Sequence, residues 1–92
     1  MTRHDILKKS DEIVNGNREQ DYGSPENNFK TIAILWNGYI KAIKRDHLEP
    51  HDIAALLSLL KIARIASGHA KEDNWIDLAG YAACGGELQG RV

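Results

Sequence analysis

The sequence predicts an all-α protein that forms a single-domain bundle of about four helices. Apolar residues recur at helical spacing in four segments, glycine or proline separates these segments, and no segment alternates polar and apolar residues as a strand does. The 92 residues suffice for one domain, 1–92, with a modest core. Because such a core is small, we expect a homo-oligomer, either a dimer or a larger assembly.

The first helix is expected over residues 2–15. Thr2 followed by Asp5 resembles a capping box, and the apolar residues of this segment fall on one face, opposite its charges. Asn15 and Gly16 are typical of a helix end. The following stretch, 17–24, is polar and lacks apolar anchors, so we expect a loop.

The second helix is expected over residues 25–45, with Ser24 as its N-cap and Pro25 at its first position. Its apolar stripe is wide enough to meet two neighbouring helices. The stripe consists of Phe29, Ile32, Ala33, Leu35, Trp36, Tyr39, Ile40 and Ile43.

The third helix is expected over residues 50–67 and should end at Ser67 and Gly68. Its apolar residues cover nearly the full circumference, and the interruptions are Ser58, Lys61 and Arg64. A helix that is apolar all round is a buried helix, so we expect this third helix to be nearly fully buried at the centre of the bundle.

The fourth helix is expected over residues 73–87, with Asp73 as its N-cap. The pair Gly85 and Gly86 should weaken its end, and the tail to Val92 should fray. Small residues on this helix permit close approach of another helix, either within the chain or across a dimer; they are Ala79, Gly80, Ala82, Ala83 and Gly85.

Composition excludes several classes of protein. The 12 Lys and Arg against 13 Asp and Glu give a net charge of −1, which argues against a nucleic-acid binder, as does the absence of a polar, basic recognition helix. Cys84 is the lone cysteine and is expected in the core or at an interface. The N-terminus does not resemble a signal peptide, and the apolar run 53–66 is too short and too charged to span a bilayer. We therefore expect a cytoplasmic protein with no membrane partner.

Lys61 and Arg64 are the first candidate for a functional site, because they share one face of the most apolar helix. Two buried cations need partners. In one interpretation Asp77 or Glu72 neutralises them, or they reach solvent. In the other they line a cleft and bind a phosphate or another anion, for which the pairing of a guanidinium with an ammonium is suited.

Two further groups are candidates. Asp73 and Asp77 are four residues apart on one helical face, a spacing that suits Mg²⁺ but equally suits a cap and an ion-pair partner. In the loop 17–24, Arg18, Asp21 and Tyr22 are candidates for contacts to an anion or a base. The alternative is that this loop is a hydrogen-bonded connector.

The ordered motifs of the chain resemble a family of small uncharacterised all-α proteins encoded by phages and prophages. The residues that carry this resemblance are Arg18-x-x-Asp21-Tyr22-Gly23, Asn28-Phe29, Ile32-Ala33-x-Leu35-Trp36, Lys61-x-x-Arg64 and Asp73-Asn74-Trp75-x-Asp77-x-x-Gly80-Tyr81. The resemblance implies a phage or prophage origin and a location in the host cytoplasm, and it implies no activity.

A second resemblance is to the MazG-like all-α NTP pyrophosphohydrolases, whose protomers associate and hold Mg²⁺ between carboxylates of facing helices. Asn74-x-x-Asp77 stands where that class carries Glu-x-x-Asp, and the Glu-x-x-Glu motif is missing. A metal-dependent hydrolase needs enough acids to hold its ion, and Glu19 and Asp21 are the remaining candidates.

These observations leave three hypotheses. In the first, the protein is a phage accessory protein that binds a nucleotide or another phosphate-bearing small molecule through Arg18, Lys61 and Arg64. If it is an enzyme, we expect a Mg²⁺-dependent nucleotide pyrophosphohydrolase. In the second, a non-catalytic accessory protein binds a host protein or sequesters a signalling nucleotide. In the third, the polar cluster is purely structural.

Overall fold

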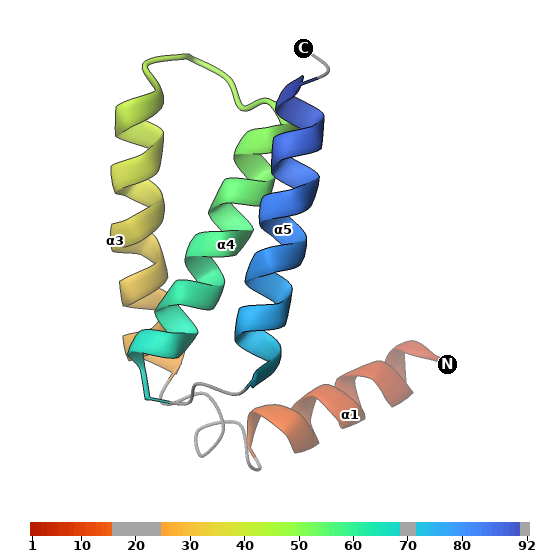
Figure 1. Cartoon of the computed structure of the whole chain (residues 1–92). Helices are drawn as coiled ribbons and strands as arrows, with labels where there is room; N and C mark the ends of the chain where they lie inside the picture. The colour runs from red at the N-terminus through yellow and green to blue at the C-terminus, as the bar shows by residue number, and fades with distance from the viewer. Residues whose placement is uncertain (16–24, 69–71, 91–92) are drawn as a thin grey trace.

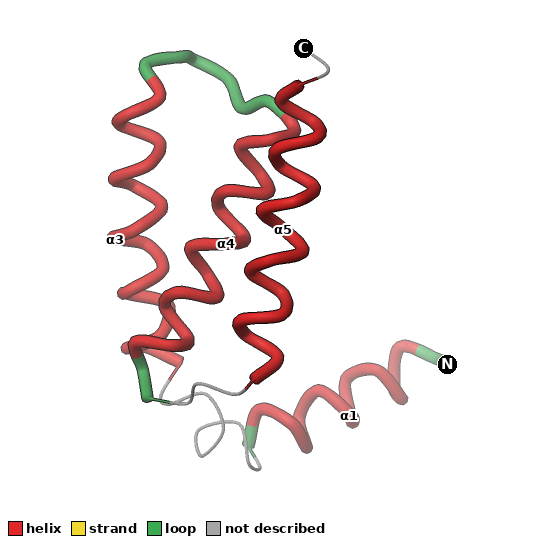
Figure 2. The backbone as a smooth tube through the Cα atoms, viewed as in Figure 1, coloured by secondary structure: helices red, strands yellow, loops and turns green. Residues whose placement is uncertain are grey.

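The computed structural model describes residues 1–15, 25–68 and 72–90, and in these ranges the regular secondary structure is all α-helical. Figures 1 and 2 show four helices, namely α1 (Arg3–Val14), α3 (Pro25–Ile43), α4 (Pro50–Ala66) and α5 (Glu72–Gly90). The all-α fold class is therefore confirmed.

Three of the helices lie side by side in one layer. Helix α4 is in the middle, it packs against α3 on one side and α5 on the other, and successive helices run antiparallel (Figure 1). Helix α1 lies apart from this layer. We call α3, α4 and α5 the three-helix layer.

Helix α1 begins with the predicted capping box. The backbone N–H of Asp5 donates to Thr2 Oγ1 at 3.2 Å, and the backbone N–H of Thr2 donates to Asp5 Oδ2 at 2.9 Å. The bond from the Thr2 backbone lowers the pKa of Asp5, and the Thr2 hydroxyl adds to this effect. Ile6 and Leu7, from the apolar face, are exposed because α1 does not lie against the layer.

Helix α3 is two residues shorter than predicted. It ends at Ile43 because Lys44 adopts a left-handed conformation with φ of 55°. Lys44 and Arg45 therefore belong to the connection to α4. The predicted N-cap, Ser24, lies outside the described residues.

Helix α4 begins at Pro50, as predicted, with Glu49 as its N-cap. It ends at Ala66, one residue earlier than predicted. Ser67 is the C-cap, and Gly68, at φ of 84°, donates its N–H to the carbonyl oxygen of Ile65 at 3.2 Å. Glycine takes this left-handed conformation without strain, which explains why the helix ends here.

The core lies along α4 and is small. Its buried apolar side chains, among the described residues, are Ala54, Leu56 and Ala63. Ile53 and Ile62 of the same helix remain 45% and 42% exposed. The expectation that the third helix is nearly fully buried is thus not met in one copy of the chain, because its neighbours cover two sides of it and not the full circumference.

The apolar stripe of α3 is only partly covered. Trp36 is half-buried, and its Nε1–H donates to the carbonyl oxygen of Leu56 at 2.8 Å, which joins α3 to α4. Phe29 and Ile40 are exposed. The stripe was expected to meet two neighbours, and in the described structure the neighbour against which α3 mainly packs is α4.

Helix α5 differs from its prediction at both ends. It begins at Glu72, so Asp73 is its second residue and not its N-cap, and it continues through Gly85 and Gly86 to Gly90. A Cβ at Gly85 would come within 3.1 Å of the Ala54 Cβ, so this glycine allows close packing of α5 on α4. That packing outweighs the low helix propensity of glycine.

Cys84, on the same helix, is exposed. The expectation that its thiol lies in the core is therefore wrong. The alternative of an interface remains a prediction.

Candidate functional site

The order of the helices brings several predicted site residues to one end of the three-helix layer. Helix α3 starts, α4 finishes and α5 starts at this end, which is the lower end in Figure 1. We call it the polar end and define it by Asn28, Lys61, Arg64, Asn74 and Asp77. The segment 16–24 directly precedes α3 in the sequence.

Lys61 and Asp77 form an ion pair between α4 and α5. The distance from Lys61 Nζ to Asp77 Oδ2 is 2.9 Å, and the Lys61 side chain is only 12% exposed. The expected neutralisation of Lys61 by Asp77 is therefore present. Arg64 lies one turn further along α4 and is half-buried.

Two asparagines at the polar end are buried. Asn74 is 1% exposed and Asn28 is 8% exposed. The Asn28 carboxamide oxygen Oδ1 is buried and accepts no hydrogen bond within the part of the chain that the structure describes. A buried acceptor without a donor costs free energy, so this oxygen is a position where a donor from another molecule would be favourable.

Asp73 and Asp77, the candidate metal ligands that the structure describes, lie four residues apart on α5. Asp73 is exposed and Asp77 is engaged with Lys61. Within the ranges that the structure describes, no group of three or more His, Cys, Asp or Glu side chains lies close enough to hold a metal ion.

The loop candidates Arg18, Glu19, Asp21 and Tyr22 lie outside the described residues. Their contact with Lys61 and Arg64, and the binding of Mg²⁺ with help from Glu19, stay predictions.

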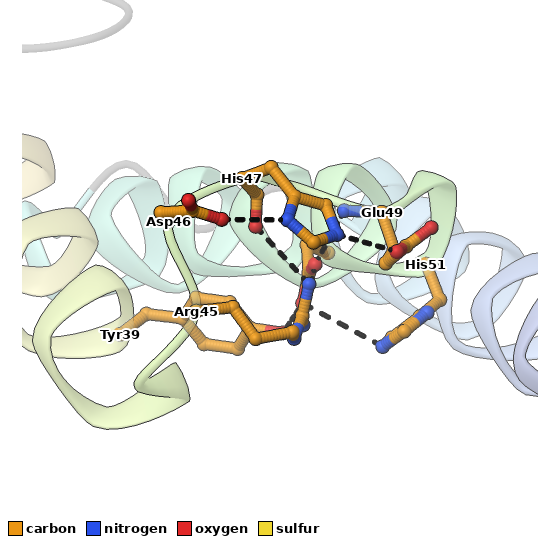
Figure 3. Close-up of polar contacts among 7 residues, drawn as sticks. Tyr39, Arg45, Asp46, His47, Glu49 and His51 are labelled. Carbon is orange, nitrogen blue, oxygen red and sulfur yellow. Dashed lines mark hydrogen bonds and ion pairs between the residues drawn. The ribbon is translucent and has the colours of Figure 1, made fainter.

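The opposite end of the layer holds a polar cluster that the sequence analysis missed (Figure 3). Asp52, whose side chain is 1% exposed, accepts a hydrogen bond from Tyr39 Oη at 2.5 Å, two from Arg45 Nη2 at 2.9 and 2.7 Å, and one from the Glu49 backbone N–H at 2.7 Å. His51 Nε2 lies 3.6 Å from Asp52 Oδ1. We call these five residues the Asp52 cluster.

The contacts of this cluster shift the pKa values of its members. The hydrogen bond from Tyr39, followed by the bonds from the Glu49 backbone and from Arg45, holds the pKa of Asp52 well below its usual range. The same carboxylate raises the pKa of Tyr39 and that of Arg45. Asp52 is therefore ionised at neutral pH, and its charge is compensated by Arg45.

Part of the Asp52 cluster carries a local sequence signal. Glu49-Pro50-x-Asp52 places proline at the first helical position and an acid at the third, and the structure has a reciprocal capping arrangement between Glu49 and Asp52. This pattern could have identified the helix start and the backbone contact. The contacts with Tyr39 and Arg45 are tertiary and leave no local pattern.

A pocket of about 390 Å³ adjoins the Asp52 cluster. It lies between the end of α3 and the facing sides of α4 and α5. Its polar and aromatic lining residues include Tyr39, Arg45, His51, Asp52, Tyr81 and Gln89. Since Arg45 already bonds to Asp52 and to the carbonyl oxygen of His47, the pocket offers no uncommitted guanidinium to an anion.

Comparison with known families gives a match over residues 5–89 to a domain of unknown function, DUF6378. The chain belongs to this family. The matched range contains the polar end and the Asp52 cluster as well as the loop 17–24. The expected kinship with small phage proteins is supported by two curated relatives of this chain.

These relatives are both called Gene 55 protein. The one from Mycobacterium phage L5 is 42% identical over 77 residues, which are 84% of this chain and 47% of the relative. The one from Mycobacterium phage D29 is 38% identical over 79 residues, which are 86% of this chain and 50% of the relative. The chain thus spans about half the length of the curated relatives it matches. No solved structure matches the chain.

The family and its relatives lend no support to the resemblance to MazG-like enzymes.

In the described part of the chain, no helix is both long enough and apolar enough to cross a bilayer.

Proposed function

We propose that this phage-type protein binds a nucleotide or a similar phosphate-bearing small molecule at the polar end. The observation that carries the proposal is the meeting, at one end of the layer, of Lys61 and Arg64 with the N-termini of α3 and α5. Helix N-termini carry a partial positive charge and favour anions. Because Asp77 compensates the charge of Lys61, the attraction of this end for an anion comes from Arg64 together with the two N-termini, and it is opposed by the single C-terminus of α4.

The buried asparagines favour a nucleotide over a bare phosphate. Phosphate oxygens accept hydrogen bonds, whereas the Asn28 Oδ1 atom needs a donor. Amino groups of bases and hydroxyl groups of sugars are such donors. A nucleotide would meet both demands, with its phosphates near Lys61 and Arg64 and its donor groups near Asn28.

Binding is better supported than catalysis. Hydrolysis of an NTP with release of pyrophosphate would require Mg²⁺, and the described acids at this end are the exposed Asp73 and the ion-paired Asp77. Catalysis would therefore depend on Glu19 and Asp21 from the loop 17–24. The proposal places the protein in the host cytoplasm, where nucleotides are available.

The direct experiment uses a panel of nucleotides with and without Mg²⁺ and measures thermal shift, calorimetric binding and pyrophosphate release. We expect at least one nucleotide to raise the melting temperature. Lys61→Met should weaken binding about tenfold or more, because it removes a cation from the phosphate site. No binding of any nucleotide by the wild-type protein would contradict the proposal.

Asp77→Asn separates the functional from the structural interpretation of the polar end. If the Lys61–Asp77 pair positions Lys61 for a ligand, the substitution changes nucleotide affinity while the melting temperature of the free protein changes little, because the Asp77 side chain is 45% exposed. If the pair is purely structural, stability falls and binding does not change. Tyr39→Phe is the matched control, since it removes a hydrogen bond at the opposite end.

A further inference from the structure

The connection between α3 and α4, residues 44–49, carries a histidine whose ring lies between two carboxylates (Figure 3). His47 Nδ1 is 3.0 Å from Asp46 Oδ1, and His47 Nε2 is 2.8 Å from Glu49 Oε1. Glu49 is the N-cap residue of α4, so the imidazole joins the middle of the connection to the start of this helix. We call these two contacts the His47 bridge.

The protonation state of His47 decides whether both contacts of the bridge can form. An ionised carboxylate accepts hydrogen bonds but cannot donate one, and a neutral imidazole carries a single N–H group. Only the imidazolium form can therefore donate to Asp46 and Glu49 at the same time. The hydrogen bonds to Asp46 and then to Glu49 raise the pKa of His47, and partial burial and the charge of Arg45 offset only part of this effect.

Few charged groups surround this imidazole. In the part of the chain that the structure describes, the charged groups that act on the ring are Asp46, Glu49 and Arg45. Helix α3 contributes Ile40 and Ile43, both uncharged, to a small pocket beside the ring. The proton of the histidine is therefore governed by groups of the connection itself.

The backbone of the same connection is tied to the Asp52 cluster. Arg45 Nη1 donates to the carbonyl oxygen of His47 at 3.1 Å, while Arg45 Nη2 donates to Asp52. The backbone N–H of Glu49 donates to Asp52 Oδ2 at 2.7 Å. A change at the His47 ring thus acts on a residue, Glu49, whose backbone is bonded to the buried carboxylate.

We propose that the His47 bridge is a pH-sensitive contact, which holds the connection to the start of α4 while His47 is protonated. Loss of the proton leaves one N–H group for two carboxylates, so one of the two contacts opens. Because the pKa of His47 is raised in the folded protein, the stabilising effect of the bridge is complete below the unfolded value of about 6.5 and is lost as the pH rises through the folded value.

NMR of the imidazole nitrogens in the full chain measures the titration of His47. We expect a midpoint above the ordinary value of about 6.5. Glu49→Gln should lower this midpoint by roughly 0.2–0.7 on the pH scale, because an exposed ion pair has an effect of this size. Glu12→Gln is the matched control, since it makes the same change of charge at an exposed position of α1 and should leave the midpoint unchanged.

Amide hydrogen exchange tests whether this proton controls the connection. In the wild-type protein we expect the protection of the Glu49 N–H, corrected for the intrinsic pH dependence of exchange, to fall roughly two- to fivefold between about pH 5.5 and about pH 8.5. His47→Gln should show the lower protection at both pH values. His4→Gln, which replaces an exposed histidine of α1, is the matched control and should behave as the wild-type protein does.

Two outcomes overturn the proposal. If Glu49→Gln does not lower the midpoint of His47, the bridge is not formed in solution. If the protection of the Glu49 N–H in the wild-type protein is equal at both pH values, the proton does not control the connection, and this result stands even where a variant does not fold. Circular dichroism checks the helical content of each variant. Neither readout involves a nucleotide, so this proposal and the proposed function fail separately.

Discussion

Asp52 shows how one buried carboxylate can fix the geometry of a small helical protein. Its oxygens receive hydrogen bonds from Tyr39 near the end of α3, from Arg45 in the connection and from the backbone of Glu49, the N-cap residue of α4. Each contact favours the ionised form, so the pKa is held low and the charge is retained at neutral pH. The residue thus joins two helices and caps one of them.

Asp52→Asn tests this role through pH dependence. Because the pKa of Asp52 is lower in the folded than in the unfolded protein, its stabilising effect is complete above the unfolded pKa of about 3.9 and is lost as the pH falls below it. We expect the variant to melt several degrees lower at pH 7 and to lose less of its stability between pH 5 and pH 2 than the wild-type protein does. Thermal melts followed by circular dichroism give both quantities.

Asp46→Asn is the control for this experiment, since it removes the same charge from an exposed side chain in the same connection. An equal change in acid sensitivity for both variants would mean that net charge, and not the buried contacts of Asp52, governs the response to acid.

At the scale of elements, helical periodicity predicts the four helices well, but tertiary packing changes their ends. The capping box at Thr2 and the end at Gly68 are local and were predicted correctly. The continuation of α5 past Gly85 depends on its contact with Ala54, which no local pattern shows. The candidate sites show the same limit of sequence-based prediction. Helical periodicity places Lys61 on a face of its helix, but it does not show that Tyr39 contacts Asp52, because that contact joins residues of different elements.

The middle position of α4 makes its buried face the main source of stability. We expect Leu56→Ala to lower the free energy of unfolding by about 2–5 kcal/mol, because it opens a cavity between α3 and α4. The bond from Trp36 to the carbonyl oxygen of Leu56 is retained, since it involves the backbone. Urea denaturation measures the change.

Ile53→Ala, on the same helix, is the matched control. Its side chain is 45% exposed, so we expect a loss of about 1 kcal/mol or less. Equal losses for the two variants would show that α4 is covered on the Ile53 side as well.

At the scale of the whole molecule, the described residues form a three-helix layer and a separate α1, and these two parts should respond differently to substitution. Thr2→Ala removes the side-chain half of the capping box and should destabilise α1 by about 1 kcal/mol. We expect a small loss of helical signal at low temperature with no shift of the cooperative transition, because α1 does not lie against the layer. A lowered cooperative transition would instead indicate that α1 packs on the layer or on a second copy.

The left-handed conformation of Lys44 has a consequence for the length of α3. A non-glycine residue in this conformation costs on the order of 1 kcal/mol, and the contact that follows it directly is that of Arg45 with Asp52. We infer that Asp52, seven residues beyond Arg45, keeps the end of α3 at Ile43 through this contact. We therefore expect loss of the Arg45–Asp52 contact to let Lys44 adopt a helical conformation and to lengthen α3 toward α4.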